Sequence, residues 1–201
     1  TVAHDVADST EAVTIQKQLD AALTEWTSPG GCTTRSTDCF VYDPRVKGVV
    51  GLTASFGSDQ FNDHHFHYGY FLYAASVAAR YAPSLVHRIE PVIDLLAADI
   101  ASPSATEDFP ARRVFDAYAG HSWASGYAPF ADGNNEESSS EAVDAWNGLE
   151  LWSRVTKDST LSTEASWLLS SEAASAKADW LDFDTSAAPF AAYQPSVVGI
   201  N

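Results

Sequence analysis

The sequence predicts an all-α fold in which long loops carry the functional residues. Five stretches place apolar residues three and four positions apart, which is the spacing of one helix face, and no stretch alternates with the period of a half-buried strand. Two long segments without helical periodicity, 27–61 and 109–135, separate these stretches. Because loops of such length in a compact domain usually serve a function, we expect the chemistry of the protein to lie in them.

Three helices are predicted in the first half of the chain, at about 9–26, 63–82 and 84–101. Their apolar positions are Ile15, Leu19, Ala22, Leu23 and Trp26, then Phe66, Tyr70, Tyr73, Ala74 and Val77, and then Leu85, Ile89, Val92, Ile93, Leu96 and Ile100. Pro83 ends the second helix, since a residue before proline disfavours the helical conformation. Pro91 lies inside the third helix, which predicts a kink or a restart there.

Two further helices are predicted at about 139–155 and 160–180. Their apolar positions are Val143, Trp146, Leu149 and Trp152, followed by Leu161, Ala165, Leu168, Leu169, Ala173 and Ala176. The tail that follows, PFAAYQPSVVGIN, has no helical pattern. Within the first long loop, the apolar runs 41–42 and 49–52 can form short extended pieces, but glycines break any longer element.

The composition restricts the partners of the protein. The net charge is −16, from 27 acidic and 11 basic residues. Nucleic acids and anionic membrane surfaces are disfavoured because both need a basic patch, whereas a neutral ligand is compatible with this charge. No apolar run approaches the ~20 residues that a membrane-spanning helix needs. The first residues lack the features of a signal peptide and the chain contains no methionine, so we expect 1–201 to be an excised or processed segment.

Cys32 and Cys39 are the two cysteines of the chain and bracket a polar loop. A zinc site would require more cysteines in closer pairs, so a disulfide that closes this small loop is favoured over two free thiols. A disulfide in turn favours an oxidising, extracellular compartment.

The segment NDHHFHYGY, 62–70, combines one aspartate, three histidines and three aromatic residues. Asp63 stands where the second helix begins and can be its cap, because aspartate is among the best N-cap residues. Alternatively it is a general acid, since aromatic surroundings raise the pKa of a carboxyl group by desolvation and keep its proton available near neutral pH.

The three histidines of this segment admit either a metal site or a polar role. His64 and His67 share a helix face, while His65 points elsewhere. A metal would recruit two of them and a distant carboxylate, but the His–Glu spacing of metalloproteases is absent. Contacts with substrate hydroxyl groups, or hydrogen bonds that orient Asp63, are favoured over the metal.

A second acidic motif, NNEESSSE at 134–141, contains Glu137 and Glu141, which would share a helix face if the fourth helix already runs there. The motif is also typical of a solvated helix N-terminus, where acidic residues interact favourably with the helix dipole and serines act as caps. It follows a glycine-rich aromatic loop, however, and a helix N-terminus supplies the hydrogen-bonded carboxylate that a base for water activation needs.

The loop between the two acidic motifs contains GHSWASG, 120–126. Its small residues let the backbone pass close to a ligand, and Trp123 is either a core residue or a platform on which a sugar ring stacks. The G-x-S-x-G elbow of serine hydrolases is absent. Two carboxylate motifs that flank an aromatic loop, in a protein suited to a neutral ligand, are typical of a glycosidase.

The segments NDHHFHYGYFLYAAS, DLLAADIASPS and FDAYAGHSWASGYAPFADGNNEESSSEAVDAWNGLELW resemble glycoside hydrolase family 81, the endo-β-1,3-glucanases (laminarinases) of fungi, plants and bacteria. The resemblance runs from about residue 10 to the end of the chain. It implies an α/α toroid, a six-hairpin barrel of paired helices, preceded by a β-sandwich domain that is expected to be absent here. Because such a toroid needs about twelve helices, 1–201 is expected to be a single segment of an incomplete catalytic domain.

The resemblance also implies roles for individual residues in an inverting reaction that uses neither a metal nor another cofactor. Asp63 matches the general acid. Glu137 is the first match for the general base and Glu141 the second, a choice that spacing leaves open. The residues that match substrate contacts are His65, His67, Tyr70, Asp116, His121 and Trp123. Glu136 stands where many members have glutamine, and a third acid there could raise the pKa of the base.

These expectations amount to endo-hydrolysis of internal β-1,3-glucosidic bonds by a secreted, monomeric enzyme, with laminarin, curdlan or cell-wall glucan as its substrate. One alternative is a non-catalytic glucan-binding fragment, which keeps the aromatic cleft without enough of the barrel for turnover. The other alternative is a metal-dependent hydrolase built on His64 and His67.

Overall fold

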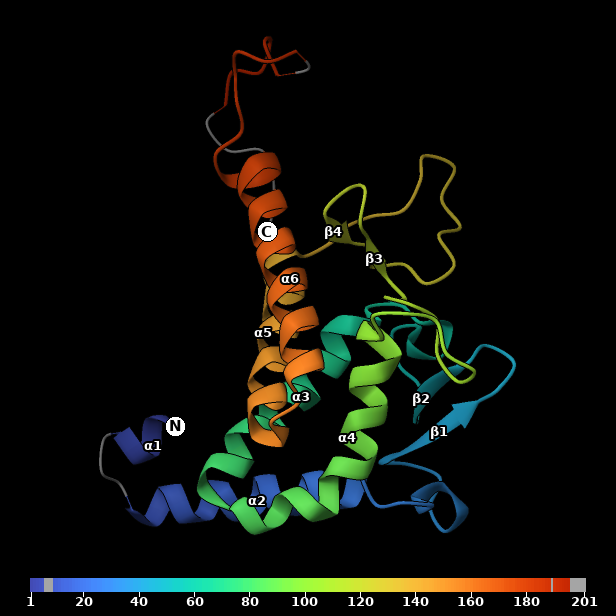
Figure 1. Cartoon of the computed structure of the whole chain (residues 1–201), viewed down its shortest axis with the longest axis vertical. Helices are drawn as coiled ribbons and strands as arrows, with labels where there is room; N and C mark the ends of the chain where they lie inside the picture. The colour runs from blue at the N-terminus through green and yellow to red at the C-terminus, as the bar shows by residue number, and fades with distance from the viewer. Residues whose placement is uncertain (6–8, 189, 196–201) are drawn as a thin grey trace.

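The computed structural model describes residues 1–5, 9–188 and 190–195 and is mostly helical, as predicted (Figure 1). Five helices of 16 to 18 residues follow one another in the predicted order. They are α2 (Ser9–Trp26), α3 (His64–Tyr81), α4 (Val86–Ala101), α5 (Ser139–Thr156) and α6 (Ser159–Ala176). A four-residue helix, α1 (Val2–Asp5), precedes them and has no counterpart in the prediction. That the helices belong to a toroid stays a prediction.

Capping and proline residues explain several helix boundaries. Asp158 caps α6 by accepting hydrogen bonds from two N–H groups of the first turn at 2.8 and 3.0 Å. This helix ends at Ala176, earlier than predicted, and the chain continues as a short π-helix, η4 (Lys177–Leu181). Pro91 lies inside α4, which bends along its length in Figure 1 without being divided. Of the two predicted outcomes, the kink is the one found.

A small antiparallel hairpin occupies the first long loop. β1 (Cys39–Asp43) pairs with β2 (Gly48–Leu52), with Cys39 opposite Leu52. The two short extended pieces predicted in this loop are therefore confirmed; β1 is three residues longer than the apolar run that predicted it, and β2 is one residue longer.

A second, shorter hairpin lies in the loop that precedes α5, which was expected to be mostly irregular. β3 (Phe115–Asp116) pairs with β4 (His121–Ser122). The described chain also contains the single-turn 3-10 helices η1 (Gly31–Thr33), η2 (Ser58–Gln60) and η3 (Pro83–Leu85).

α3 and α5 pack with almost no side chain between them at one point. A Cβ atom on Gly69 would lie 2.4 Å from the Cα of Ala145, and one on Gly148 would lie 2.7 Å from the carbonyl oxygen of Gly69. Both separations are too short for real atoms, so the two backbones can approach this closely only because these positions are glycine. The contact sets the helix that follows Asp63 against the helix that contains Glu141.

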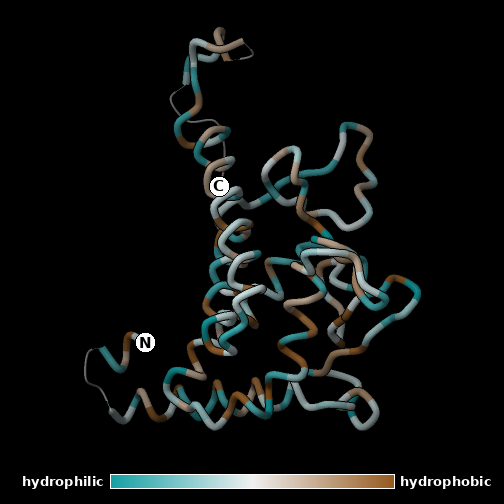
Figure 2. The backbone as a smooth tube through the Cα atoms, viewed as in Figure 1, coloured by the Kyte–Doolittle hydropathy of each residue, from teal (hydrophilic) through white to brown (hydrophobic). Residues whose placement is uncertain are grey.

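The hydrophobic core lies where α3, α4, α5 and α6 meet. Its largest fully buried side chains are Leu72, Leu85, Ile89, Ile93, Leu96, Ile100, Trp146, Leu149, Trp152 and Leu168. All of them except Leu72 are positions that predicted the helices, and Figure 2 shows hydrophobic residues recurring along α4 between hydrophilic ones. Ile15, Tyr70 and Tyr73 were expected to face the core but are exposed. Among the described helices, none is both long and apolar enough to cross a bilayer.

A buried charge network anchors the first hairpin to the helices. Asp99 of α4 is fully buried, and its carboxylate accepts a hydrogen bond from the N–H of Val49 at 2.8 Å. The same carboxylate accepts from Nε2 of His64 at 2.9 Å and from Nε of Arg113 at 2.6 Å. A buried charge is tolerated when it is paired and hydrogen-bonded in this way. The network therefore joins β2, the start of α3 and the loop after α4.

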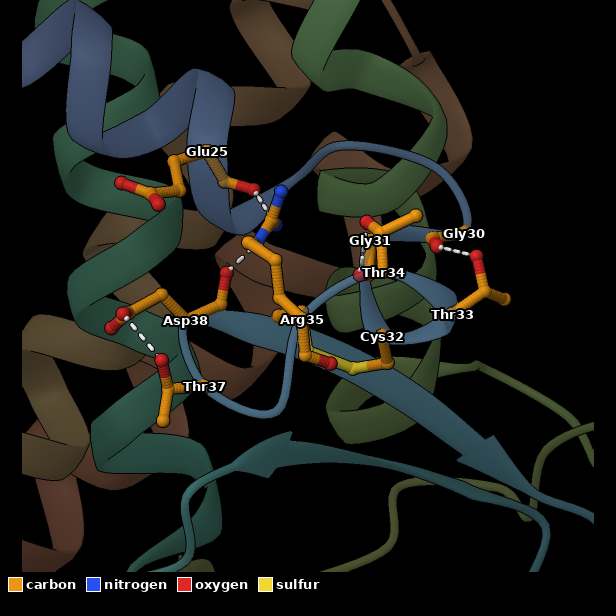
Figure 3. The surroundings of a disulfide bond; sticks show 10 residues. Glu25, Gly30, Gly31, Cys32, Thr33, Thr34, Arg35, Thr37 and Asp38 are labelled. Carbon is orange, nitrogen blue, oxygen red and sulfur yellow. Dashed lines mark hydrogen bonds between the residues drawn. A yellow bond between two sulfur atoms is a disulfide. The ribbon is translucent and has the colours of Figure 1, made fainter.

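The predicted disulfide is confirmed between Cys32 and Cys39, whose Cα atoms lie 5.5 Å apart (Figure 3). Arg35, inside the closed loop, donates hydrogen bonds to the carbonyl oxygens of Glu25 at 2.5 Å and Asp38 at 3.0 Å. The loop is thereby joined both to the end of α2 and to the residue that precedes β1.

Candidate active site

Asp63 immediately precedes α3 and has a left-handed backbone with φ of 52°. Its N–H donates a hydrogen bond to the carbonyl oxygen of Ala124 at 2.9 Å, which joins the start of the helix to the aromatic loop. The residue occupies the N-cap position, but its side chain makes no capping hydrogen bond, so the cap interpretation is wrong. Oδ1 of Asp63 is buried and has no hydrogen-bond partner among the described residues. Backbone strain and an unpaired polar atom both cost free energy, and such costs concentrate at functional sites.

The surroundings of Asp63 favour its protonated form. Burial raises the pKa of this carboxyl above its ordinary value, and the negative charge of Glu137 raises it further. His67 lowers the pKa, and Glu141 contributes a smaller increase. Because one carboxylate perturbs another appreciably only when it is near, the two acidic motifs lie around a common point in the fold.

The spacing of Glu137 and Glu141 suggested a shared helix face if the fourth helix already ran at Glu137. The structure shows that the two residues do not share one. α5 begins at Ser139, and Ser138 is its cap, with Oγ accepting from the N–H of Glu141 at 3.2 Å. Glu137 lies before the cap and has a left-handed φ of 64°. The capping interpretation of the serine run is therefore confirmed for Ser138, and the two glutamates lie on opposite sides of this cap in the chain.

The two glutamates differ in how they are held. Oε1 of Glu141 accepts a hydrogen bond from the hydroxyl of Tyr70, and this bond is the main reason that the pKa of Tyr70 rises to about 12. Oε2 of Glu137 accepts from the side-chain amide of Asn135 at 3.1 Å, and its side chain is exposed. Glu141 is thus positioned by a neighbouring helix, whereas Glu137 is open to water.

The aromatic loop is fixed against both helices by small residues. Phe66 of α3, Ala124 of the loop and Ala142 of α5 form a separate buried cluster. A Cβ atom on Gly126 would lie 1.9 Å from the carbonyl oxygen of Gln60. The glycine therefore serves a close approach to another part of the backbone, rather than the approach to a ligand that the sequence suggested.

The three histidines of the first motif have three different environments. His65 is fully buried, hydrogen-bonds through Nε2 to Oγ of Ser122 at 2.7 Å, and has a pKa lowered to about 3, mainly by burial. It lies under the site, and we do not retain it as a substrate contact. His64 is engaged by Asp99 in the buried network. His67 is half-buried and, of the three, the one placed to meet a ligand together with Tyr70.

Asp116 organises the aromatic loop. Its Oδ1 accepts from the N–H groups of Tyr118 and Ala119 at 2.8 and 3.2 Å, and its Oδ2 accepts from Nε1 of Trp123 at 3.3 Å. These hydrogen bonds hold the pKa of Asp116 below its usual value. The ring of Trp123 also packs edge-on against His121, with centroids 4.4 Å apart. The indole is half-exposed and held in a fixed orientation, as a stacking platform requires.

Two hollows are lined by residues of the two acidic motifs. One has a volume of about 600 Å³ and is lined by Trp123, Glu137 and Trp180, among others. The other has a volume of about 230 Å³ and is lined by aromatic residues together with His67 and Tyr70. His67 lines the smaller hollow and Glu137 lines the larger one, and both side chains influence the pKa of Asp63.

Sequence reasoning missed a buried acid beneath the larger hollow. Glu172 of α6 is fully buried and accepts hydrogen bonds from the N–H of Ser122 and from Nε1 of Trp146, both at 3.0 Å. The signal was present in the pattern, because Glu172 lies four residues after Leu168 and four before Ala176 on the apolar stripe. An acidic residue on such a stripe indicates a buried polar site.

The geometry of paired carboxylates beside aromatic platforms agrees with a comparison with protein families. The model of the "Glycosyl hydrolase family 81 C-terminal domain" matches residues 1–201. The chain belongs to glycosyl hydrolase family 81. The family resemblance inferred from the motifs is thereby confirmed.

Curated relatives of this family 81 chain carry one common name. "Glucan endo-1,3-beta-D-glucosidase" of Acetivibrio thermocellus is 41% identical over 82% of this chain and 22% of the relative. The protein of that name in Thermobifida fusca is 40% identical over 80% of this chain and also 22% of the relative. A solved structure of a mutant "Glycoside hydrolase family 81 from Clostridium thermocellum" matches with a TM-score of 0.83 and 37% identity, over 90% of this chain and 26% of that one. The chain thus spans about a fifth of the length of these curated relatives.

Proposed function

We propose that this chain carries the acid and the base for endo-hydrolysis of internal β-1,3-glucosidic bonds with inversion of the anomeric centre. The observation that carries the proposal is Asp63, a half-buried carboxyl with an unpaired buried oxygen and a raised pKa beside two further carboxylates. Relatives that align over most of the chain are named glucan endo-1,3-beta-D-glucosidases, which supplies the substrate class.

Asp63 is the proton donor to the leaving glycosidic oxygen. A general acid must hold its proton at the working pH and release it as the bond breaks, and burial beside like charges meets the first requirement. The backbone of Asp63 is held by the hydrogen bond from its N–H to the carbonyl oxygen of Ala124 and by the start of α3. The orientation of the carboxyl toward the bond is therefore set before the substrate binds.

Glu137 is the base that deprotonates water on the opposite face of the sugar. Its side chain is exposed and lines the larger hollow with Trp123, so water can reach it. Inversion places the two carboxyl groups roughly 6.5–9.5 Å apart, which leaves room for that water. Glu141 is held by the hydrogen bond from Tyr70 and contributes to the raised pKa of Asp63.

The two hollows, one lined by His67 and Tyr70 and the other by Glu137 and Trp123, suit an internal bond of a long polymer. A glucan that passes from the hollow of His67 and Tyr70 to that of Trp123 and Trp180 would place an internal linkage at the acid. Aromatic rings offer faces to the C–H surfaces of glucose, and a neutral polymer is not repelled by an acidic protein. We assign laminarin, curdlan and cell-wall glucan as substrates of a secreted, monomeric enzyme, the disulfide being consistent with an oxidising compartment.

The base assignment is tested by Glu137→Gln and Glu141→Gln in the full chain, with laminarin cleavage followed with and without azide by mass spectrometry, which detects both hydrolysed fragments and the glycosyl azides that azide attack forms. Removal of the base is expected to lower kcat by about 10²–10⁴-fold. Azide should restore turnover only in Glu137→Gln, because the small anion attacks in place of the activated water.

Two other outcomes of this experiment would redirect the assignment. Rescue of Glu141→Gln alone would make Glu141 the base. If the unsubstituted chain binds laminarin but releases no reducing ends, the glucan-binding alternative replaces hydrolysis for this chain.

The pH profile offers an independent test of the acid. Activity requires protonated Asp63, so kcat/KM should fall as pH rises through the pKa of this residue, which lies above that of an ordinary aspartate. The charge of Glu141 raises this pKa, and Glu141→Gln should therefore move the alkaline limb of the residual activity to lower pH. Asp59→Asn, an exposed substitution in η2, should leave the limb in place. An unmoved limb in Glu141→Gln would exclude Asp63 as its source.

A further inference from the structure

Three side chains from three separate segments converge beneath the larger hollow. His121 lies on β4, Glu136 in the segment before α5, and Glu172 on α6. Each offers one ligand atom, and the three atoms lie within 4.8 Å of one another. Within the described part of the chain, this is the one group of three or more such residues that comes together so closely.

The tautomer of His121 is fixed by its backbone neighbour. Nδ1 lies 2.9 Å from the carbonyl oxygen of Ser122. A carbonyl oxygen can only accept, so Nδ1 carries the proton and the neutral ring has its lone pair on Nε2. A histidine that donates one ring N–H to a backbone carbonyl while the other nitrogen remains free is the usual arrangement of a metal ligand.

Both carboxylates are oriented by hydrogen bonds from outside the group. Glu172 accepts from the N–H of Ser122 and from Nε1 of Trp146, both at 3.0 Å. Glu136 accepts through Oε2 from Nε1 of Trp180 at 2.8 Å. Its other oxygen, Oε1, is buried and has no hydrogen-bond partner among the described residues. Hydrogen bonds thus hold all three side chains, from donors to the two carboxylates and from His121 to the carbonyl oxygen of Ser122, and one buried oxygen is left for a further partner.

The charge of the group also calls for a cation. Neither Glu136 nor Glu172 forms an ion pair with a lysine or arginine within the described residues. Two carboxylates brought together away from water repel each other unless a positive charge or a proton lies between them. Imidazole nitrogen with two carboxylate oxygens is a donor set that suits zinc and similar divalent transition metals.

We propose that His121, Glu136 and Glu172 form a binding site for one divalent transition-metal ion. Around zinc, ligand atoms at about 2.1 Å in tetrahedral geometry lie roughly 3.4 Å apart, so the side chains need to close by little more than an ångström. His121 and Glu136 line the larger hollow, from which water could reach the ion as a fourth ligand. No step of the proposed hydrolysis passes through the ion, and the site stands independently of the proposed function.

The ion would link three segments that lie apart in the sequence. β4 carries the aromatic loop, α6 is the last long helix, and Glu136 precedes the proposed base directly. Coordination would therefore fix the backbone of Glu137 in its left-handed conformation. It also assigns Nε2 of His121 to the ion instead of to a direct sugar contact.

The site is tested by titrating the chelator-treated full chain with Zn²⁺ in a calorimeter and with Co²⁺ in a visible spectrometer. One ion per chain is expected, with the Co²⁺ absorption of a low-coordinate site. Glu136→Gln should weaken binding at least about tenfold, since it removes a charged ligand while keeping an acceptor for Trp180. Glu107→Gln, at an exposed carboxylate away from the group, should bind as the unsubstituted chain does.

The outcomes are separable from those of the glucanase assays, because no glucan is present. Zinc binding that Glu136→Gln leaves unchanged would place the ion elsewhere and overturn the proposal. The proposal would also be overturned if zinc neither binds stoichiometrically nor raises Tm, while Glu136→Gln does raise Tm. That result would show that a shared proton, rather than a metal, lies between the two carboxylates.

Discussion

Replacing Asp63 by asparagine is expected to lower kcat on laminarin by about 10³-fold, the contribution typical of a general acid. The asparagine keeps the shape of the side chain but has no proton to transfer to the leaving oxygen. The activity of Asp63→Asn on a β-1,3-gluco-oligosaccharyl fluoride, whose leaving group needs no proton, should fall far less. Reducing-end and fluoride-release assays on the same preparation measure the two effects.

The same substitution is expected to stabilise the fold at pH values above the folded-state pKa of Asp63. The folded-state pKa of Asp63 is raised, so the stability that its protonated form contributes is complete below the unfolded pKa and is lost as pH rises through the folded pKa. Above that pKa the native protein carries a desolvated charge beside Glu137 that asparagine lacks. Urea unfolding over a series of pH values should show a higher midpoint for Asp63→Asn at the alkaline end, and the difference should vanish in acid.

Asp59→Asn is the matched control, because this exposed aspartate lies four residues upstream, in η2. It should change neither kcat nor the unfolding midpoint. A large loss of activity in Asp63→Asn that is equal on laminarin and on the fluoride would contradict a role in proton donation. A stability difference between Asp63→Asn and the unsubstituted chain that does not grow as pH rises would contradict the raised pKa.

Replacing Asp99 by alanine is expected to cost about 3–5 kcal/mol of stability, the range for breaking a buried ion pair by removing one partner. The substitution leaves the guanidinium of Arg113, the ring of His64 and the N–H of Val49 without their common acceptor. Urea unfolding with the disulfide intact measures the loss. The hairpin of β1 and β2 should lose its amide protection first, because this carboxylate links it to α4.

Asp43→Ala provides the control in the same hairpin. Asp43 also pairs with an arginine, Arg45, but that pair lies at the surface, where solvent screens it. Its loss should change stability little. If Asp99→Ala and Asp43→Ala unfold at the same urea concentration, the buried network does not stabilise the fold as described.

The helices were predictable because their burial follows a period that the sequence displays. Ile89, Ile93, Leu96 and Ile100 repeat at helical spacing, and all four are buried in the core. The disulfide followed from the short spacing of two cysteines in a polar loop. Of the candidate site, the position of Asp63 before a helix and its convergence with the second acidic motif were accessible through the family motifs.

The parts that sequence could not supply depend on backbone conformation and long-range contacts. Glu137 adopts a left-handed φ, which residues other than glycine seldom do, so the sequence left open whether this residue belongs to the helix. The burial of His65 depends on Ser122, which lies in another segment. Acids such as Asp99 and Glu172 stand on apolar stripes, and only the fold reveals which donors satisfy them.

The glycine contact between α3 and α5 sets how closely the two helices that carry the acidic motifs approach each other. Asp63 leads into one helix and Glu141 lies in the first turn of the other, and the spacing of the two backbones at Gly69 contains no side chain that could change rotamer. Stereochemical outcome in glycosidases follows the separation of the carboxyl groups. Because Glu137 directly precedes the cap of α5, a single methyl group at position 69 would displace the proposed base relative to Asp63 without touching any acid. The identity of this one buried residue therefore bears on whether the two carboxyl groups keep the separation that their proposed reaction needs.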